Sequence, residues 1–133
     1  MEDQEAVFKL GMMEQQLNQL QQQLQSVVRG ISELESLNLG LDEINQAKDK
    51  EIFAQIGKGI YIKSKLISED LIINVGDNNF VNRTVPEVKE LIISQIKRLK
   101  EVELELSGNI NSINNEFLSM IQEYQKHEKE EKL

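Results

Sequence analysis

The sequence predicts a mainly α-helical protein, an antiparallel coiled-coil helical hairpin with two central β-hairpins that join an oligomeric β-barrel. Two long segments carry apolar residues at alternating steps of three and four, which is the seam of a coiled coil. The segment between them alternates apolar and polar residues and is divided by turn clusters. We assign one unit over 1–133, with a first arm at about 8–49, hairpins at 51–84, a second arm at 85–126 and a tail at 127–133.

The first arm has a regular apolar seam, and the rest of its surface is polar and solvent-exposed. The intervening residues are mostly Gln, Glu, Asn and Ser, and the glutamine-rich stretch 14–24 keeps its leucines in register, which favours a solvated helix face. The seam comprises Leu10, Met13, Leu17, Leu20, Leu24, Val27, Ile31, Leu34 and Leu41.

The middle segment switches to a period of two, which predicts four short strands and therefore two β-hairpins. Gly57-Lys58-Gly59, 68–70 and 76–79 supply the turns. Two hairpins make no independent core, and their unpaired apolar edges must be covered. We therefore expect this segment to assemble with copies or relatives of itself, through Ile52, Ile56, Ile60, Ile62, Leu66, Leu71, Ile73, Val75 and Phe80.

The second arm begins near Thr84, which suits a helix N-cap because Pro86 and Glu87 follow in the first turn. Its seam repeats the three–four rhythm, with Val102 or Glu103 at one irregular step. The seam comprises Val88, Ile92, Ile96, Leu99, Leu106, Ile110, Ile113, Phe117, Met120 and Tyr124. In an antiparallel register Leu34 would face Leu99 and Leu10 would face Tyr124, so the arms are expected to pair, within one chain or between two.

Composition excludes several classes of function. The chain has 15 basic and 23 acidic residues, a formal net charge of −8, and both arms are acidic, which disfavours a nucleic-acid partner. It has no Cys, no apolar run long enough to cross a bilayer, and an acidic start at Met1–Glu5 where a secretory signal is basic. These features predict a soluble, cytoplasmic protein with no membrane partner.

No motif in the chain predicts catalysis, a metal or a cofactor. Gly57-Lys58-Gly59 lacks the spacing and the following helix of a P-loop. Asp77-Asn78-Asn79 lacks the rest of a calcium loop, and His127 stands alone among Lys126, Glu128, Lys129 and Glu130. We expect no enzyme activity.

The ends of the two arms, farthest from the strands, carry the candidate binding residues. Flexible thioethers and aromatics suit surfaces that accept many partners. Leu10, Met13, Phe117, Met120 and Tyr124 fall on the seam and suit packing as well as binding. Four further residues fall off the strict seam and are expected to be exposed: Phe8, Met12, Leu118 and Ile121.

The order of helix, two hairpins and helix resembles the prefoldin alpha subunit, its archaeal type above all. The residues that carry the resemblance are 56–63 (IGKGIYIK), 73–81 (INVGDNNFV) and 84–88 (TVPEV). The resemblance implies a hexamer of two alpha and four beta subunits, whose hairpins form a double β-barrel. It further implies that the arms capture unfolded client proteins without ATP and deliver them to a group II chaperonin.

Two other functions stay open from the residues alone. A coiled-coil scaffold or tether would bind one defined folded partner. An arm-type RNA binder would need a basic arm, which the counted charges disfavour.

Overall fold

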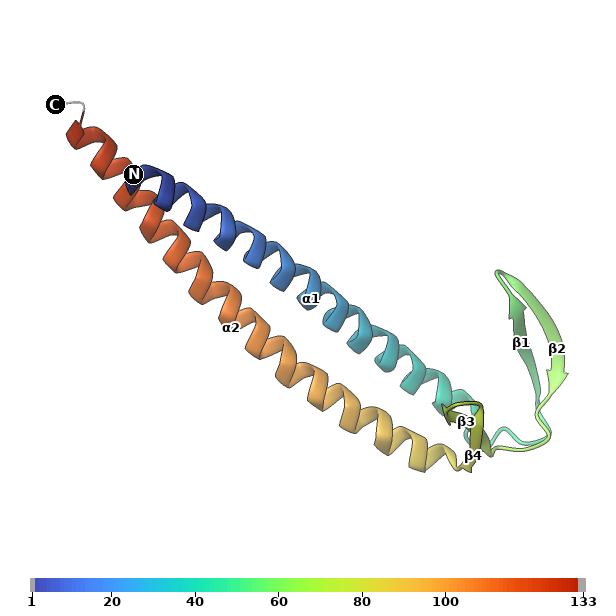
Figure 1. Cartoon of the computed structure of the whole chain (residues 1–133). Helices are drawn as coiled ribbons and strands as arrows, with labels where there is room; N and C mark the ends of the chain where they lie inside the picture. The colour runs from blue at the N-terminus through green and yellow to red at the C-terminus, as the bar shows by residue number, and fades with distance from the viewer. Residues whose placement is uncertain (1, 132–133) are drawn as a thin grey trace. The chain divides into compact units, whose positions relative to one another are not determined.

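The computed structural model describes residues 2–131 and consists of two long helices with four strands between them (Figure 1). Its contacts divide it into two compact units. The arm unit combines residues up to Ile31 with residues from Arg98 onward, and the hairpin unit is Ser32–Lys97. No helix within residues 2–131 is long and apolar enough to cross a membrane.

Helix α1 spans Glu2–Ile44. It begins six residues earlier than the predicted arm over 8–49 and ends five residues earlier. Its end is set by backbone geometry at Gln46, which has a φ of 62°, the left-handed conformation that commonly follows a helix C-terminus. The Asn45 N–H donates to the Leu41 carbonyl (3.1 Å) and the Ala47 N–H donates to the Ile44 carbonyl (3.0 Å). These bonds satisfy carbonyls that would otherwise lack partners in the last turn.

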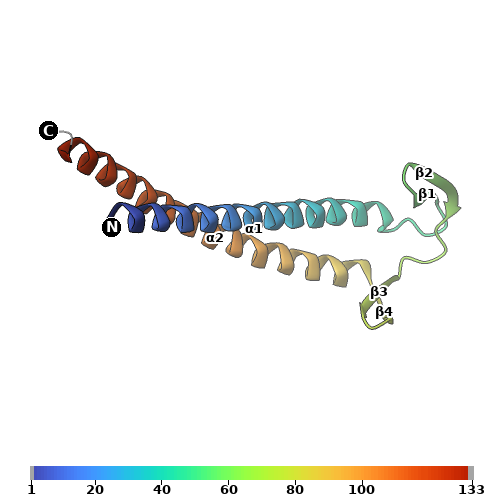
Figure 2. The same cartoon turned by 45° about the horizontal axis from the view of Figure 1, so that its top comes forward.

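The arm unit is a pair of antiparallel helical segments lying side by side (Figure 1, Figure 2). Its most buried residues belong to the predicted seams: Leu17, Ile31, Leu106 and Ile110. Leu99 lies against Gly30, where a Cβ atom would be 3.6 Å from Leu99 Cδ1. Gly30 is one helical turn before Leu34, the residue that the sequence predicted to face Leu99. At the irregular step of the second seam, Glu103 is half-buried while Val102 is exposed.

The strands form two separate antiparallel pairs. Strand β1 (Glu51–Gly57) pairs with β2 (Ile60–Lys65), and β3 (Leu71–Gly76) pairs with β4 (Asn79–Arg83). Each pair has a bulge before its turn, between Gln55 and Gly57 and between Asn74 and Gly76. The second turn places Asp77 and Asn78 at positive φ, as a type I′ turn requires.

A small apolar core anchors the helix ends of the hairpin unit. Leu41, Val85 and Ile92 are its buried members. Leu34, Ile44, Leu71, Val88 and Ile96 pack against them. Lys89 and Asp42 form an ion pair between α1 and α2 beside this core. The apolar seam residues of the two helices therefore also pack together at the helix ends that flank the strands.

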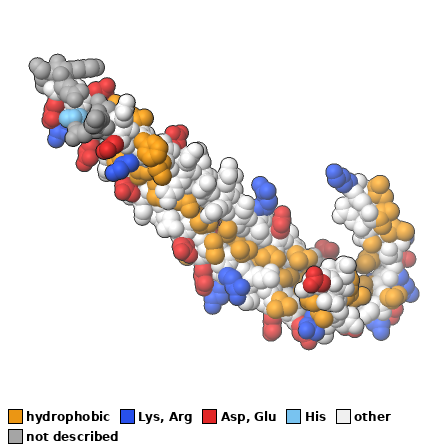
Figure 3. Space-filling view, in the orientation of Figure 1, with side chains coloured by type: hydrophobic (Ala, Val, Ile, Leu, Met, Phe, Trp, Pro, Cys, Tyr) orange, Lys and Arg blue, Asp and Glu red, His pale blue; other side chains and the backbone are white. Residues whose placement is uncertain are grey.

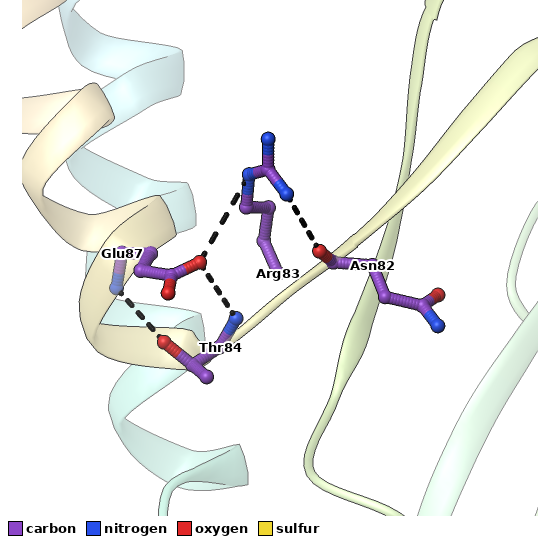
Figure 4. A network of polar contacts seen from close by, with 4 residues as sticks. All are labelled: Asn82, Arg83, Thr84 and Glu87. Carbon is purple, nitrogen blue, oxygen red and sulfur yellow. Dashed lines mark hydrogen bonds and ion pairs between the residues drawn. The ribbon is translucent and has the colours of Figure 1, made fainter.

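Helix α2 spans Val85–Glu131, and its start confirms Thr84 as the N-cap. The Glu87 N–H donates to Thr84 Oγ1 (3.3 Å), and the Thr84 N–H donates to Glu87 Oε2 (3.4 Å), which together form a capping box (Figure 4). Arg83 Nε lies 3.9 Å from the same Glu87 oxygen.

The helix continues through residues 127–131, where the sequence predicted a tail. This stretch has no apolar seam, but its Lys and Glu residues are good helix formers and Lys126 and Glu130 have the i, i+4 spacing of a favourable pair. Residues 132–133 of the predicted tail lie outside the described residues.

Candidate interaction surfaces

Within residues 2–131 no group of three or more His, Cys, Asp or Glu side chains could hold a metal ion. Lys58-Gly59 and Asp77-Asn78 are the turns of the two β-hairpins. The candidate sites described below are the exposed apolar surfaces of the hairpins and of the arm unit.

The first hairpin, β1–β2, has one aliphatic face. Residues paired across antiparallel strands lie on the same face, and faces alternate along each strand. The pairs Ile52–Ser64 and Ala54–Ile62 therefore define one face, to which alternation adds Ile56 and Ile60. Ile56, Ile60 and Ile62 are all exposed.

The opposite face of β1–β2 is polar but carries two aromatic rings. The pairs Phe53–Lys63 and Gln55–Tyr61 lie on it, and Lys63 Nζ is 3.3 Å from Glu51 Oε2 on the same face. Phe53 is 72% exposed, more than Ile56, Ile60 or Ile62, so this hairpin exposes large apolar side chains on both faces.

The second hairpin, β3–β4, repeats this two-sided pattern. One face has the pairs Leu71–Arg83 and Ile73–Val81, with Val75 added by alternation. The other has the pairs Ile72–Asn82 and Asn74–Phe80, so Ile72 and Phe80 are diagonal neighbours among asparagines. Ile72, Val75 and Phe80 are exposed, and Figure 3 shows orange hydrophobic side chains on the visible surface of the hairpins.

The predicted assembly residues therefore divide into two groups. Leu71 packs against the core of the hairpin unit, and Ile52, Leu66 and Ile73 are half-buried. The others are exposed: Ile56, Ile60, Ile62, Val75 and Phe80. Sequence reasoning missed further exposed side chains, Phe53, Tyr61, Ile67 and Ile72. A signal for Phe53, Tyr61 and Ile72 was present, since each is a large apolar residue at an alternate position of a predicted strand.

Both sheets have two strands each, so every strand has one edge without a partner strand. The pairing of β1–β2 extends beyond the strands, since the Asp49 N–H donates to the Leu66 carbonyl (2.7 Å) and the Leu66 N–H donates to the Lys50 carbonyl (3.0 Å). Open edges beside exposed aliphatic side chains are surfaces that natural proteins cover.

The candidate arm-end residues lie in the arm unit, and their exposure follows the seam. Phe8, Met12 and Leu118 are exposed as predicted, whereas Ile121 is half-buried. Ile121 follows Phe117 by four residues and precedes Tyr124 by three, so it shares the seam face of α2. The remaining candidates are all half-buried: Leu10, Met13, Phe117, Met120 and Tyr124.

A groove on one side of the arm unit brings three of the four methionines together. It has a volume of about 810 Å³ and is lined by Lys9, Met12, Met13, Gln15, Gln16, Gln19, Ile113, Glu116 and Met120. At Met120 it adjoins a hollow of about 460 Å³ that includes Ala6, Glu123 and Tyr124. At Gln19 it adjoins one of about 740 Å³ that includes Gln22, Gln23, Val27 and Leu106.

This fold defines a class of proteins in which two long helices are joined through two β-hairpins. The family model described as "Prefoldin subunit" matches residues 13–130. The chain therefore belongs to the prefoldin family, a family of chaperone components, and this confirms both the resemblance and the predicted helices and hairpins.

The similar curated proteins are archaeal alpha subunits. Prefoldin subunit alpha of Methanobrevibacter smithii is 27% identical over 106 residues, which cover 79% of this chain and 73% of that protein. Prefoldin subunit alpha 2 of Thermococcus kodakarensis is 35% identical over 89 residues, covering 64% of this chain and 63% of that protein. Prefoldin subunit alpha of Methanosphaera stadtmanae is 31% identical over 94 residues, covering 63% and 66%.

A solved structure has the same fold. A chain of the cryo-EM structure of filamentous PFD from Methanocaldococcus jannaschii matches with a TM-score of 0.70 at 19% identity. The match covers 90% of this chain and 98% of that one.

Proposed function

We propose that this chain is the alpha-type subunit of a cytoplasmic prefoldin hexamer, two alpha with four beta subunits, that holds unfolded proteins without ATP and delivers them to a group II chaperonin. The observation that carries the assembly is the pair of hairpins with exposed apolar side chains on both faces and an open edge on every strand. Closure of the hairpins into a β-barrel with those of other subunits removes the edges.

The free energy gained by burying the exposed hairpin side chains also supports assembly. Burying a large aliphatic or aromatic side chain contributes about 1.5–3 kcal/mol. The exposed hairpin side chains are numerous enough to offset the cost of association, which is about 4–15 kcal/mol. They are Phe53, Ile56, Ile60, Tyr61, Ile62, Ile72, Val75 and Phe80.

Client capture is assigned to the arm-end surface, which we define as Phe8, Met12, Leu118 and the groove that contains Met13 and Met120. Phe8, Met12 and Leu118 are exposed apolar side chains on the arm unit. Exposed thioethers adapt to different side chains, which suits binding of many unfolded proteins rather than one folded partner. Several arms on one body would raise the effective concentration for each further contact, so each contact can be weak.

The first test is the native mass of the complex recovered with this chain. Two copies together with four copies of a smaller, single-hairpin partner are the expected result. A homodimer, or a complex with one defined folded protein, would contradict the proposal and favour a coiled-coil scaffold.

The second test is client holding by the reconstituted complex. A chemically unfolded client is diluted into buffer without nucleotide, and aggregation is followed by light scattering. The assembled complex is expected to suppress aggregation and to release the client to a group II chaperonin, whereas the free chain holds it poorly. Suppression by the free chain equal to that by the complex would contradict the multivalent mechanism.

A further inference from the structure

A closed β-barrel encloses one face of each hairpin, because side chains alternate between its interior and its exterior along every strand. The aliphatic face of β1–β2 has no charged residue, so it suits the interior of the proposed barrel. The opposite face, which we call the outer face, then stays outside with Phe53 72% and Tyr61 58% exposed. Barrel closure therefore leaves two large rings uncovered. The outer face comprises Glu51, Phe53, Gln55, Tyr61, Lys63 and Lys65.

The first hairpin is the basic segment of the hairpin unit. Residues 45–66 hold five lysines and two carboxylates, a net charge of +3, and all seven residues are exposed. Residues 32–44 of α1 hold four carboxylates and no basic residue, a net charge of −4. The remaining segments have net charges of −2 at 67–84 and zero at 85–97. The first hairpin and the end of α1 are therefore electrostatically complementary, and two copies of the chain related by a twofold axis can use this complementarity reciprocally.

The end of α1 and the start of α2 share an apolar patch beside their core. Leu37 and Val88 occupy equivalent heptad positions, each three residues after one residue of the core cluster and four before the next. Equivalent positions of two antiparallel paired helices lie on the same side of the pair, where Gly40 and Ile44 continue α1 and Leu91 continues α2. Leu37 and Leu91 are 50% and 55% exposed, whereas Ile44 and Val88 are half-buried. We call these five residues the helix-end patch.

Gly40 lies in the middle of the α1 side of this patch and is exposed. A Cβ atom there would meet no atom within 4 Å, whereas Gly30 is packed against Leu99. A glycine weakens the helix around it relative to alanine, so Gly40 brings no benefit within the free chain. Without a side chain, the backbone at Gly40 is open to close approach by a ring of another chain.

The charges around the helix-end patch have one sign. Within the two helices, the charged residues one turn from a member of the patch are Glu33, Glu43 and Glu87, and all three are exposed. On the outer face of β1–β2, two lysines oppose one carboxylate. The outer face therefore combines exposed aromatic rings with a net positive charge, which matches an apolar patch with acidic surroundings.

We propose that, in the assembled complex, the outer face of β1–β2 in one copy of this chain docks on the helix-end patch of a second copy. Phe53 and Tyr61 lie over Gly40, and the lysines of the outer face lie beside Glu33 and Glu43. A twofold axis between the two copies makes the contact twice. This inference rests on the proposed assembly, and it adds a contact between the two alpha-type subunits outside the barrel interior.

Crosslinking tests the docking directly, because the chain has no cysteine of its own. The complex is assembled with Gln55→Cys and Ser36→Cys in the same chain, which place thiols on the outer face and one helical turn from Gly40. A short bismaleimide is expected to join residue 55 of one copy to residue 36 of the other, and peptide mass spectrometry identifies the covalent dimer. The matched control, Ala54→Cys with Ser36→Cys, moves the first thiol to the aliphatic face and is expected to give at least about fivefold less dimer.

Filling the position of Gly40 tests the close approach. Gly40→Gln is expected to strengthen the helix of the free chain, yet to raise the concentration at which the complex half-dissociates at least about fivefold. Gly108→Gln is the matched control, since Gly108 is also exposed and faces open space but lies in the arm unit. It is expected to strengthen its helix and to leave dissociation unchanged. Circular dichroism measures the helix, and native mass over a dilution series measures dissociation.

The outcomes separate this contact from the proposed assembly. No covalent dimer, a crosslink to a beta-type subunit, equal crosslinking from both hairpin faces, or equal dissociation of the Gly40 and Gly108 variants would overturn the docking. A hexamer of the expected mass alongside any of these results leaves the proposed assembly standing. Failure of the unmodified chain to form that hexamer would instead contradict the proposed function itself.

Discussion

The first turn of α2 depends on two reciprocal hydrogen bonds between Thr84 and Glu87. Thr84→Ala removes the hydroxyl acceptor of this capping box and is expected to lower the free energy of unfolding by about 1 kcal/mol. Thr84→Ser keeps the hydroxyl and is the matched control. Urea unfolding of the two variants followed by circular dichroism measures the difference, and equal losses would show that the hydroxyl contributes nothing.

Two adjacent isoleucines of α2 lie in opposite environments. Ile92 is 4% exposed in the core of the hairpin unit, whereas Ile93 is 56% exposed. Ile92→Ala is expected to lower the free energy of unfolding by about 2–5 kcal/mol because it leaves a cavity beside Leu41 and Val85. Ile93→Ala in the free chain is expected to change it by less than about 0.5 kcal/mol. Equal effects in urea unfolding would contradict the core described here.

At the scale of the elements, the hairpin turns distinguish two glycines that both face open space. Gly76 has a φ of 118°, where a side chain is strained, whereas the φ of Gly57 lies outside that region. Gly76→Ala is therefore expected to destabilise the β3–β4 hairpin by about 1–3 kcal/mol, and Gly57→Ala by much less. Hydrogen exchange of the strand amides measures each hairpin separately. Equal protection of both hairpins in the two variants would refute the prediction.

The helices owe their bounds to different physical causes. Helix α1 ends where Gln46 takes a left-handed conformation, although the predicted arm continued to residue 49. Helix α2 continues beyond its last seam residue, Tyr124, because local propensity maintains a helix without apolar contacts. The apolar seam therefore predicts where helices pair, not where each helix begins and ends.

For the whole molecule, client holding and assembly are expected to be separable. Replacing Phe8, Met12 and Leu118 together by Ser is expected to reduce suppression of client aggregation severalfold while the native mass of the complex stays unchanged. Leu104→Ser is the control, since Leu104 is also exposed on the arm unit but lies outside the arm-end surface. Unchanged holding by the triple variant would exclude these residues from client binding.

Much of the fold followed from local periodicity. Apolar steps of three and four predicted the helices, alternation predicted the strands, and Thr84 with Glu87 predicted the cap, because each depends on residues close in the chain. The family was also recognisable from short stretches such as 56–63 and 73–81. The sequence predicted which regions carry the candidate surfaces. It predicted less well which individual side chains in those regions are exposed.

The tertiary structure decided what residues distant in sequence do together. Pairing across strands shows that Phe53 and Tyr61 share a face opposite Ile62, which alternation along one strand leaves unassigned. Packing between elements places Leu71 against the core formed by Leu41, Val85 and Ile92. The sequence by itself determined the elements because their causes are local, whereas burial and the groove around Met13 and Met120 depend on contacts that exist only once the chain has folded.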